Sequence, residues 1–298
     1  MTDGGIETTL IFHEGIDLPC FASFDLLKRP DGIEVLRRYF EPYLTVASEQ
    51  GVGLILDSPT WRANADWGKK LGYTAAELDL ANRKGITLIE EIRSANQDRL
   101  APIVLSGCVG PRGDGYRPTD LMTAAEAERY HEIQIRTLSE TAADMVTALT
   151  IPYAEEAIGV ARASQRLAMP VVISFTVETD GRLPSGQELK DAIAQVDDDT
   201  EGAPAYFMIN CAHPTHFANV LATGEQWADR IGGIRANASS KSHAELDEAT
   251  EIDEGDPVEL GGQYRALRPW LRKMNVVGGC CGTDHRHVAA VCKAWRKG

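Results

Sequence analysis

The feature that most constrains this chain is an alternation of short apolar runs with longer amphipathic segments. Seven runs rich in Val and Ile have the length of buried strands, and they lie at 52–58, 101–107, 144–150, 170–177, 205–211, 231–237 and 275–281. Continuous apolar strands that alternate with helices are typical of a parallel sheet covered by helices. The sequence therefore predicts an α/β fold.

Helices are indicated between these runs by periodicity and by capping patterns. Apolar residues recur at every third or fourth position over 33–47 and again over 288–295, as on one face of a helix. Capping-box patterns predict helix starts at three places, which are Thr74–Glu77, Thr123–Glu126 and Ser185–Glu188.

The number of strand–helix units favours a (β/α)8 TIM barrel, and 298 residues is an ordinary length for one. The eighth strand would lie at the start of the chain, just before or over Asp3-Gly4-Gly5. A doubly wound open sheet is the alternative, but its nucleotide-binding pattern G-x-G-x-x-G is absent after the first strand. Since no linker or shift in composition marks a second domain, we predict one barrel domain over residues 1–298.

Charge and the start of the chain narrow the functional classes. A net charge of −14 argues against a nucleic-acid partner, because phosphate contacts need clustered Lys and Arg. The opening residues MTDGGIETTL show no signal-peptide pattern, and no apolar run reaches the roughly 20 residues that span a bilayer. We expect a cytoplasmic protein without membrane contacts. In such a reducing compartment, six cysteines favour metal binding or catalysis over disulfides.

Three of the six cysteines lie at the ends of predicted strands. Cys211 ends the run 205–211, and Cys280 and Cys281 end the run 275–281. The carboxyl ends of barrel strands open on one face, so these thiols should converge there. Zinc takes tetrahedral thiolate ligands, and a catalytic site keeps the fourth position open for substrate. We therefore predict a Zn²⁺ site, with the flanking glycines supplying the backbone angles for the turn at the paired cysteines.

The other cysteines and nearby histidines have simpler interpretations. Free cysteine is often a small buried apolar residue, and we interpret three in this way: Cys20, Cys108 and Cys292. Four histidines fall in the first turns of predicted helices, where polar residues are ordinary, and we expect none to be a metal ligand: His213, His216, His285 and His287.

These motifs resemble the homocysteine S-methyltransferase family, which includes the betaine–homocysteine and S-methylmethionine–homocysteine enzymes and the homocysteine-binding domain of cobalamin-dependent methionine synthase. The most specific match is GGCCGT at 278–283, and it is joined by Asn210-Cys211 and Asp3-Gly4-Gly5. Segments 106–111 and 173–186 resemble further family motifs in the right order. The likeness covers nearly the whole chain.

The resemblance implies a (β/α)8 barrel that binds one zinc through Cys211, Cys280 and Cys281, with homocysteine sulfur as the fourth ligand. It also implies contacts between the amino-acid end of the substrate and Asp3, Gly4 and Gly5. Asn237 would lie near the open position of the metal.

Two departures from the family pattern affect these expectations. Leu149 stands where the family has an acidic residue that binds the ammonium group of the substrate. Either the acceptor is not homocysteine, or another carboxylate near a strand end replaces it, the candidates being Glu7, Asp57 and Glu178. Family members also have an apolar strand before Asp-Gly-Gly, whereas only Met1 and Thr2 precede it here. We therefore expect a truncated first strand and poor bridging of its neighbours at the bottom of the barrel.

The predicted activity is methyl transfer from a small sulfonium or ammonium donor to homocysteine or a related thiol, giving methionine or a thioether. A zinc-dependent hydrolase and a non-catalytic zinc- or thiol-binding barrel are the alternatives. Trp61, Trp67 and Trp227 could enclose a cationic methyl group, with Trp61 best placed, but packing is the interpretation we favour. The expected partners are small molecules, and a homo-oligomer stays open.

One long irregular stretch, 238–262, is acidic. We favour a solvated loop for it. A lid over the site is the functional alternative, because long loops at the top of a barrel tend to be functional.

Overall fold

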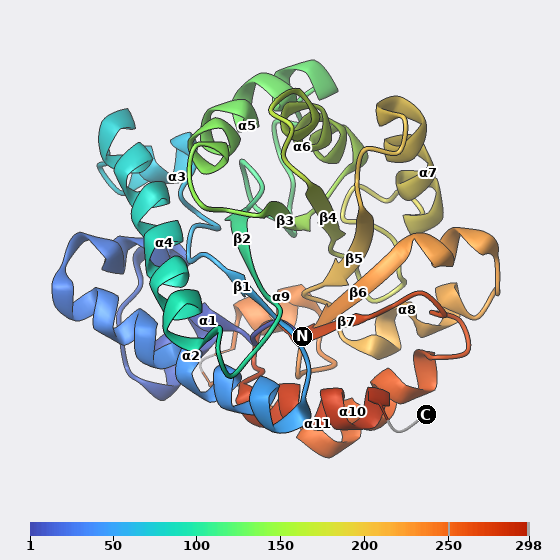
Figure 1. The fold of residues 1–298 in the computed structure, drawn as a ribbon. Coiled ribbons are helices and arrows are strands. Elements are labelled where there is room, and N and C mark those ends of the chain that lie inside the picture. Colours follow the sequence, from blue (N-terminus) through green and yellow to red (C-terminus); the bar gives the residue numbers. More distant parts are fainter. Residues whose placement is uncertain (250, 297–298) are drawn as a thin grey trace.

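The computed structural model is a parallel barrel inside a ring of helices, and it describes residues 1–249 and 251–296 (Figure 1). Each strand pairs in parallel with the next strand along the chain, in the order β1 to β7. Their bounds are β1 Leu54–Asp57, β2 Ile103–Val109, β3 Met145–Ile151, β4 Val171–Phe175, β5 Tyr206–Asn210, β6 Ile231–Ala236 and β7 Val276–Gly279. All seven predicted strands are confirmed, with bounds within two residues of those expected.

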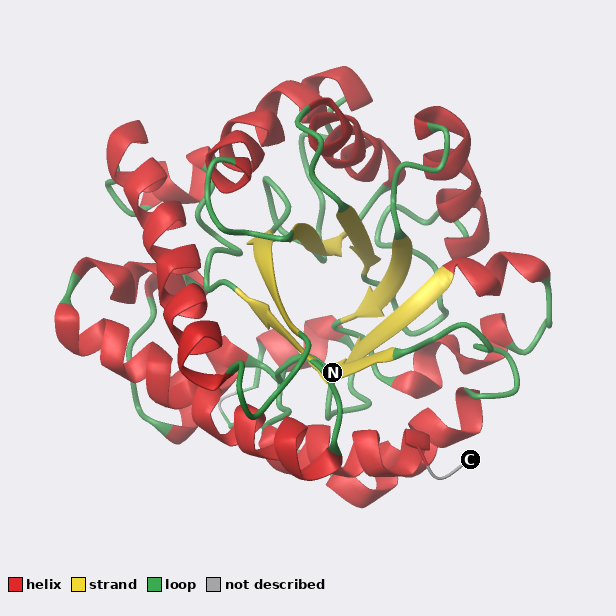
Figure 2. Cartoon of the chain, viewed as in Figure 1, coloured by secondary structure: helices red, strands yellow, loops and turns green. Residues whose placement is uncertain are grey.

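Figure 2 shows the sheet curled around a central axis, with a ring of helices on its outer side. The predicted TIM barrel is confirmed, and the doubly wound open sheet is wrong because the strand order follows the sequence without reversal. The helices are α1 Ile6–Thr8, α2 Pro30–Gln50, α3 Ala65–Lys70, α4 Ala75–Asn96, α5 Ala124–Ser139, α6 Ala154–Arg166, α7 Leu189–Thr200, α8 Pro214–Leu221, α9 His243–Asp247, α10 Pro257–Leu267 and α11 His285–Arg296. In the described part of the chain, none of them is long and apolar enough to cross a membrane.

The first three residues close the gap between β7 and β1. Thr2 N–H donates to the Val277 carbonyl at 2.9 Å, and the Met1 carbonyl accepts from Ile55 N–H at 2.8 Å. On the β7 side, Gly279 N–H also donates to the Asp3 carbonyl at 2.9 Å. Residues 1–3 therefore stand in for the expected truncated strand through backbone bonds, although they form no strand element of their own. The expectation of poor bridging at the bottom is wrong, because these few residues bond to both neighbouring strands.

The interior of the barrel is packed with apolar side chains below the site. The cluster consists of one side chain from each of five strands, which are Cys108, Leu149, Val172, Met208 and Val276. A larger core lies between the sheet and the helices. Since the barrel is filled rather than hollow, space for a ligand exists only at its end.

Two predicted segments differ from the structure. The Ser185–Glu188 pattern is not a helix start, because Gly186 has φ +86° and Glu188 instead accepts from Arg182 Nη2 at 2.7 Å, which closes a turn. Helix α7 begins after this turn. The stretch 238–262 is not a plain loop, since it contains α9 and the start of α10. The two other capping boxes, at Thr74 and Thr123, are confirmed.

Candidate functional site

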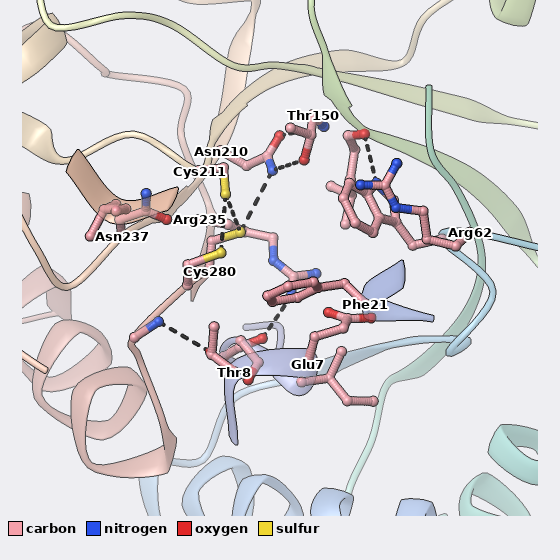
Figure 3. Close-up of a pocket in the computed structure, with 18 of the residues that line it drawn as sticks. Glu7, Thr8, Phe21, Arg62, Thr150, Asn210, Cys211, Arg235, Asn237 and Cys280 are labelled. Atoms are coloured by element: carbon pink, nitrogen blue, oxygen red, sulfur yellow. Dashed lines mark hydrogen bonds between the residues drawn. The ribbon is translucent and has the colours of Figure 1, made fainter. Parts of the chain in front are cut away.

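A cavity of about 590 Å³ lies at the carboxyl ends of the strands (Figure 3). It is lined by nearly all the residues that the sequence singled out as ligands or substrate contacts: Asp3, Gly4, Gly5, Glu7, Asp57, Trp61, Cys211, Asn237, Cys280 and Cys281. The exception is Glu178, which lies after β4 and is not among the lining residues. These residues, which are spread over the sequence, therefore lie together around one cavity.

The three predicted metal ligands form a compact sulfur cluster. Cys211 Sγ lies 3.1 Å from Cys280 Sγ and 3.4 Å from Cys281 Sγ. Tetrahedral zinc with bonds of roughly 2.3 Å would separate its sulfur ligands by roughly 3.8 Å, so small movements would open the cluster around an ion. In the described part of the chain, this is the one group of at least three Cys, His, Asp or Glu side chains close enough to share a metal ion.

Cys211 reaches the cluster through an unusual backbone conformation. Its φ is +57°, in the left-handed region that residues with a Cβ seldom occupy. The preceding Asn210 anchors this turn, because its Oδ1 accepts from Thr150 N–H at 2.8 Å and from Ser174 Oγ at 2.6 Å. Asn210 Nδ2 in turn donates to Thr150 Oγ1 at 2.8 Å. Strands β3, β4 and β5 thus fix the direction of the Cys211 side chain.

The glycines around the paired cysteines permit close packing more than special backbone angles. Of the glycines in the GGCCG segment, only Gly282 has a positive φ, of +77°. The expectation that the flanking glycines supply special backbone angles is therefore wrong for Gly278 and Gly279. A Cβ on Gly5 would lie 2.5 Å from the Cys280 carbonyl oxygen, and one on Gly4 would lie 2.7 Å from the Thr283 carbonyl oxygen. Gly4 and Gly5 are therefore needed so that the start of the chain can pack against the cysteine loop.

Replacing Gly5 with Ala should disturb the metal site without touching a ligand. The new methyl group would push against the Cys280 backbone, so metal affinity should fall about 10- to 100-fold, as when other residues that orient ligands are lost. Competition with a chromogenic zinc chelator measures this affinity. Gly262→Ala is the matched control, because its Cβ would meet no atom within 4 Å. Equal affinity in both variants would contradict the packing role of Gly5.

The charge environment favours ionised cysteine. Hydrogen bonds from the Cys211 and Cys281 thiols hold the pKa of Cys280 well below its usual range, and the nearby positive charge of Arg235 adds to this effect. The same hydrogen bonds raise the pKa values of Cys211 and Cys281, so the surroundings favour ionisation of one thiol of the three.

Arg235 forms the centre of a buried ion cluster below the cysteines. Its Nη2 lies 2.5 Å from Asp3 Oδ1, its Nη1 pairs with Asp57 Oδ2, and its Nε donates to the Gly279 carbonyl at 3.1 Å. Burial raises the pKa of Asp3 to about 6, although Arg235 opposes this shift. Asp3 and Asp57 are therefore both paired with the positive charge of Arg235. Sequence reasoning missed Arg235, although a charged residue inside an apolar strand is a signal for buried carboxylate partners.

Tyr116 is a second residue that the sequence did not indicate. Its hydroxyl lies 2.8 Å from Cys211 Sγ, and its ring stacks on His243 of α9 with ring centroids 3.9 Å apart. Burial lowers the pKa of His243 to about 4, so this histidine is neutral near pH 7. The loop after β2 and the segment after β6 therefore meet over the cysteine cluster.

The candidate carboxylates differ in whether they already have a positively charged partner. Glu7 carries no ion pair among the described residues, and its Oε1 accepts a hydrogen bond from Ser23 Oγ at 2.7 Å. Burial raises the pKa of Glu7 to about 7. Asn237 Oδ1 is buried and has no hydrogen-bond partner among the described residues, so it is an open acceptor in the cavity. Leu149 lines the same cavity and offers no charge.

The predicted tryptophans are only partly at the site. Trp61 and Trp67 line the cavity, whereas Trp227 packs against the helix side of the core. The Arg62 guanidinium lies over both cavity rings, 4.1 Å from the Trp61 centroid and 3.7 Å from the Trp67 centroid. A cationic methyl group could therefore not use the ring faces that Arg62 covers.

The segment after β6 forms one wall of the cavity, which fits the lid alternative better than a plain solvated loop. Its lining residues are Leu246, Ala249, Glu251, Ile252 and Asp253.

The remaining cysteines and histidines differ in one respect from expectation. Cys108 and Cys292 are buried as expected, but Cys20 is exposed, with φ +58°. Three of the four histidines bond to protein atoms instead of facing the cluster, these being His213, His216 and His287. His285 begins α11 and is also outside the metal cluster.

Comparison with known proteins agrees with this geometry. The family model described as homocysteine S-methyltransferase matches residues 1–295. A selenocysteine Se-methyltransferase from Brassica oleracea var. italica is 24% identical, over 98% of this chain and 87% of its own length. Homocysteine S-methyltransferase 4 from Zea mays is 23% identical, over 100% of this chain and 89% of its own length.

Solved structures show the same fold. The oxidised form of the homocysteine methyltransferase MmuM from Escherichia coli superposes with a TM-score of 0.75 at 18% identity, covering 97% of this chain and 93% of that one. Its metallated form gives a TM-score of 0.73 at 16% identity, covering 98% of this chain and 95% of that one. The match over nearly the whole sequence and the cysteine cluster at the barrel end lead to one conclusion: the chain belongs to the homocysteine S-methyltransferase family, and it is a thiol S-methyltransferase, as its sequence predicts.

Proposed function

We propose that this protein is a zinc-dependent enzyme that methylates homocysteine, or a closely related thiol or selenol, using a small cationic methyl donor. The observation that carries the proposal is the cluster of Cys211, Cys280 and Cys281 in a cavity that also contains the free carboxylate Glu7. The cluster supplies three soft ligands and leaves one position for substrate sulfur.

The chemistry divides between the metal and the chain. When held by the three thiolates, zinc would offer a site at which the acceptor thiol is deprotonated at neutral pH. Asn210 and Thr150 fix the direction of Cys211, and Arg235 supports Cys280 from below. The walls of the cavity hold acceptor and donor in line, and such alignment contributes several kcal/mol.

Glu7 is the best replacement for the acidic residue that the family has at position 149. Asp57 is already paired with Arg235, and Glu178 lies outside the cavity lining. Among the described residues, the Ser23 hydroxyl is the one side-chain hydrogen-bond partner of Glu7, so Glu7 can accept the ammonium group of an amino-acid substrate. A buried ammonium without such a partner would cost several kcal/mol.

A zinc hydrolase is the less suitable alternative. Hydrolysis requires a strong Lewis acid and a base beside the metal, whereas three thiolates donate much charge to the ion. The nearby His243 accepts no proton near pH 7, since burial holds its pKa at about 4, and it packs against Tyr116. Methylation by a donor with a neutral leaving group needs no general acid.

The proposed function extends to the setting of the enzyme. The proposal includes a cytoplasmic location, a role in methionine biosynthesis and small molecules as the partners of the enzyme. Homo-oligomer formation stays a prediction.

The test is a methyl-transfer assay in which purified reduced protein is incubated with zinc, homocysteine and S-methylmethionine. Methionine should form, and its yield should fall when zinc is removed by a chelator. Absence of methionine with S-methylmethionine, with another sulfonium donor and with the quaternary ammonium donor betaine would contradict the proposal and favour a non-catalytic thiol-binding barrel.

Replacing Glu7 with Gln should lower kcat/KM for homocysteine about 10- to 100-fold, the range expected when a charged hydrogen bond is lost. Its rate with 4-mercaptobutanoate, which lacks the amino group, should stay unchanged. In the wild-type protein, kcat/KM for homocysteine divided by kcat/KM for 4-mercaptobutanoate should rise as the pH increases through about 7. The reason is that Glu7, whose pKa is raised to about 7, then ionises and attracts the ammonium group. Equal losses for both thiols would contradict the ammonium contact.

A further inference from the structure

Arg62 is a buried cation that pairs with no carboxylate within salt-bridge distance among the described residues. Its side chain lines the cavity, and the residue is 9% exposed. Its Nη1 donates to the Gly113 carbonyl at 3.2 Å, while its Nε has no hydrogen-bond partner among the described residues. Within the ranges that the structure describes, Arg62 forms no salt bridge.

Contacts with two aromatic rings hold this guanidinium in place. It lies over Trp61 and Trp67, with its Cζ 4.1 Å and 3.7 Å from their ring centroids. Trp61 is itself fixed, because its Nε1 donates to the Leu149 carbonyl at 3.1 Å. A planar guanidinium held this way presents its N–H groups in a fixed direction, which suits binding of a carboxylate by two parallel hydrogen bonds.

Arg62 also has a suitable position relative to the sulfur site. Figure 3 shows it across the cavity from Cys211 and Cys280, with Glu7 also facing the space between them. Tyr116, Asp114 and Glu7 are close enough to Arg62 for Coulombic interaction, although neither carboxylate forms a salt bridge with it among the described residues. Tyr116 also contacts Cys211. One small molecule can therefore reach the cysteine cluster with its sulfur and Arg62 with an acidic group.

We propose that Arg62 binds the carboxylate of a substrate in this cavity. Leaving a buried charge unpaired is costly, whereas a bound carboxylate would supply the missing partner. The inference rests on the proposed function, since it names the group by which the methyl acceptor or donor is recognised. The carboxylate can come from the thiol acceptor or from an amino-acid donor, and the two sources are separable by experiment.

The acceptor arm of the test compares three thiols that differ by one group. Homocysteine has both the amino and the carboxyl group, 4-mercaptobutanoate has only the carboxyl group, and 3-aminopropane-1-thiol has only the amino group. Isothermal titration calorimetry on the reduced, zinc-supplemented protein gives their affinities. Arg62→Met should weaken binding of the two carboxylates about 10- to 100-fold and leave 3-aminopropane-1-thiol unchanged.

The donor arm uses S-methylmethionine, which has a carboxylate, and trimethylsulfonium, which does not. If Arg62 serves the donor, Arg62→Met should weaken S-methylmethionine binding by a similar factor, with all three thiols and trimethylsulfonium unaffected. Either pattern supports a carboxylate site at Arg62 and identifies its source. Unchanged affinity for every carboxylate would overturn the proposal.

Control variants separate recognition from folding. Lys70→Met removes another cation, one that lies over the Trp67 ring but outside the cavity lining, and it should leave all affinities unchanged. Arg62→Lys keeps the charge and should bind carboxylates with intermediate affinity, so a folded variant is available even if Arg62→Met is unstable. If carboxylate binding depends on Arg62 but no methyl transfer occurs with any pair, the proposed function fails and the Arg62 site stands.

Discussion

Protein purified under reducing conditions should contain one zinc per chain, and the Cys280→Ser/Cys281→Ser double variant should contain almost none. Serine is a poor ligand for zinc, so the double variant keeps only Cys211 of the three-sulfur cluster. Methyl transfer should be lost together with the metal. Inductively coupled plasma mass spectrometry measures the zinc, and the assay with homocysteine measures the activity.

The single variants should also lose most of their zinc, because each removes one of only three protein ligands. Cys292→Ser and Cys20→Ser are the controls, since both residues lie outside the cluster. Full zinc retention in the double variant would show that the metal is bound elsewhere. Loss of zinc in the Cys292→Ser variant would instead indicate a general effect on folding.

Arg235→Met should be the most destabilising single substitution outside the metal ligands. The change would leave the Asp3 and Asp57 side chains, 5% and 6% exposed, without their shared counter-charge. Breaking a buried ion pair in this way costs about 3–5 kcal/mol, which is a large share of the stability of an ordinary domain. Urea unfolding followed by circular dichroism measures the loss.

The comparison for this experiment is Arg166→Met, which removes a surface pair with Glu128. The Arg166 side chain is 60% exposed, so its loss should cost about 1 kcal/mol or less. Adding Asp3→Asn and Asp57→Asn to Arg235→Met should restore part of the stability, because the uncompensated charges are then gone. Equal stability of the Arg235→Met and Arg166→Met variants would show that the buried cluster does not stabilise the barrel.

The strand pattern was predictable because each barrel strand is buried on both faces and is therefore continuously apolar. The closing segment Met1–Asp3 was harder to assess, since its contribution consists of backbone bonds to Ile55 and Val277 rather than side-chain pattern. The false helix start at Ser185 has a local cause. Its Glu188 found a nearer partner in Arg182, and this competition is invisible in the capping pattern alone.

The cysteine cluster was predictable because its members are a distinctive residue type at strand ends, and the barrel geometry brings such ends together. The residues that contact the cluster or its neighbours were not predictable, because their own partners are remote in the sequence. Arg235 pairs with Asp57 and Asp3, which lie 178 and 232 positions away in the sequence. Tyr116 contacts Cys211, which lies 95 positions away. Arg62 has no sequence motif, and its importance arises from the two rings beside it and from the absence of a carboxylate partner in the described structure.

The contacts of Asp3 also determine when this enzyme can become active during its synthesis. The residue bonds through its carbonyl to Gly279 and through its carboxylate to Arg235, so the site joins segments that lie more than 200 positions apart in the sequence. Contacts of such large sequence separation form late in folding, because the loop between them must close first. As long as β7 and the residues after it are still inside the ribosome, the folded part of the chain contains neither Cys280 nor Cys281. The three-sulfur cluster can therefore form only after the segment with Cys280 and Cys281 has been made, and a metal ion arriving earlier would find one thiol of the three.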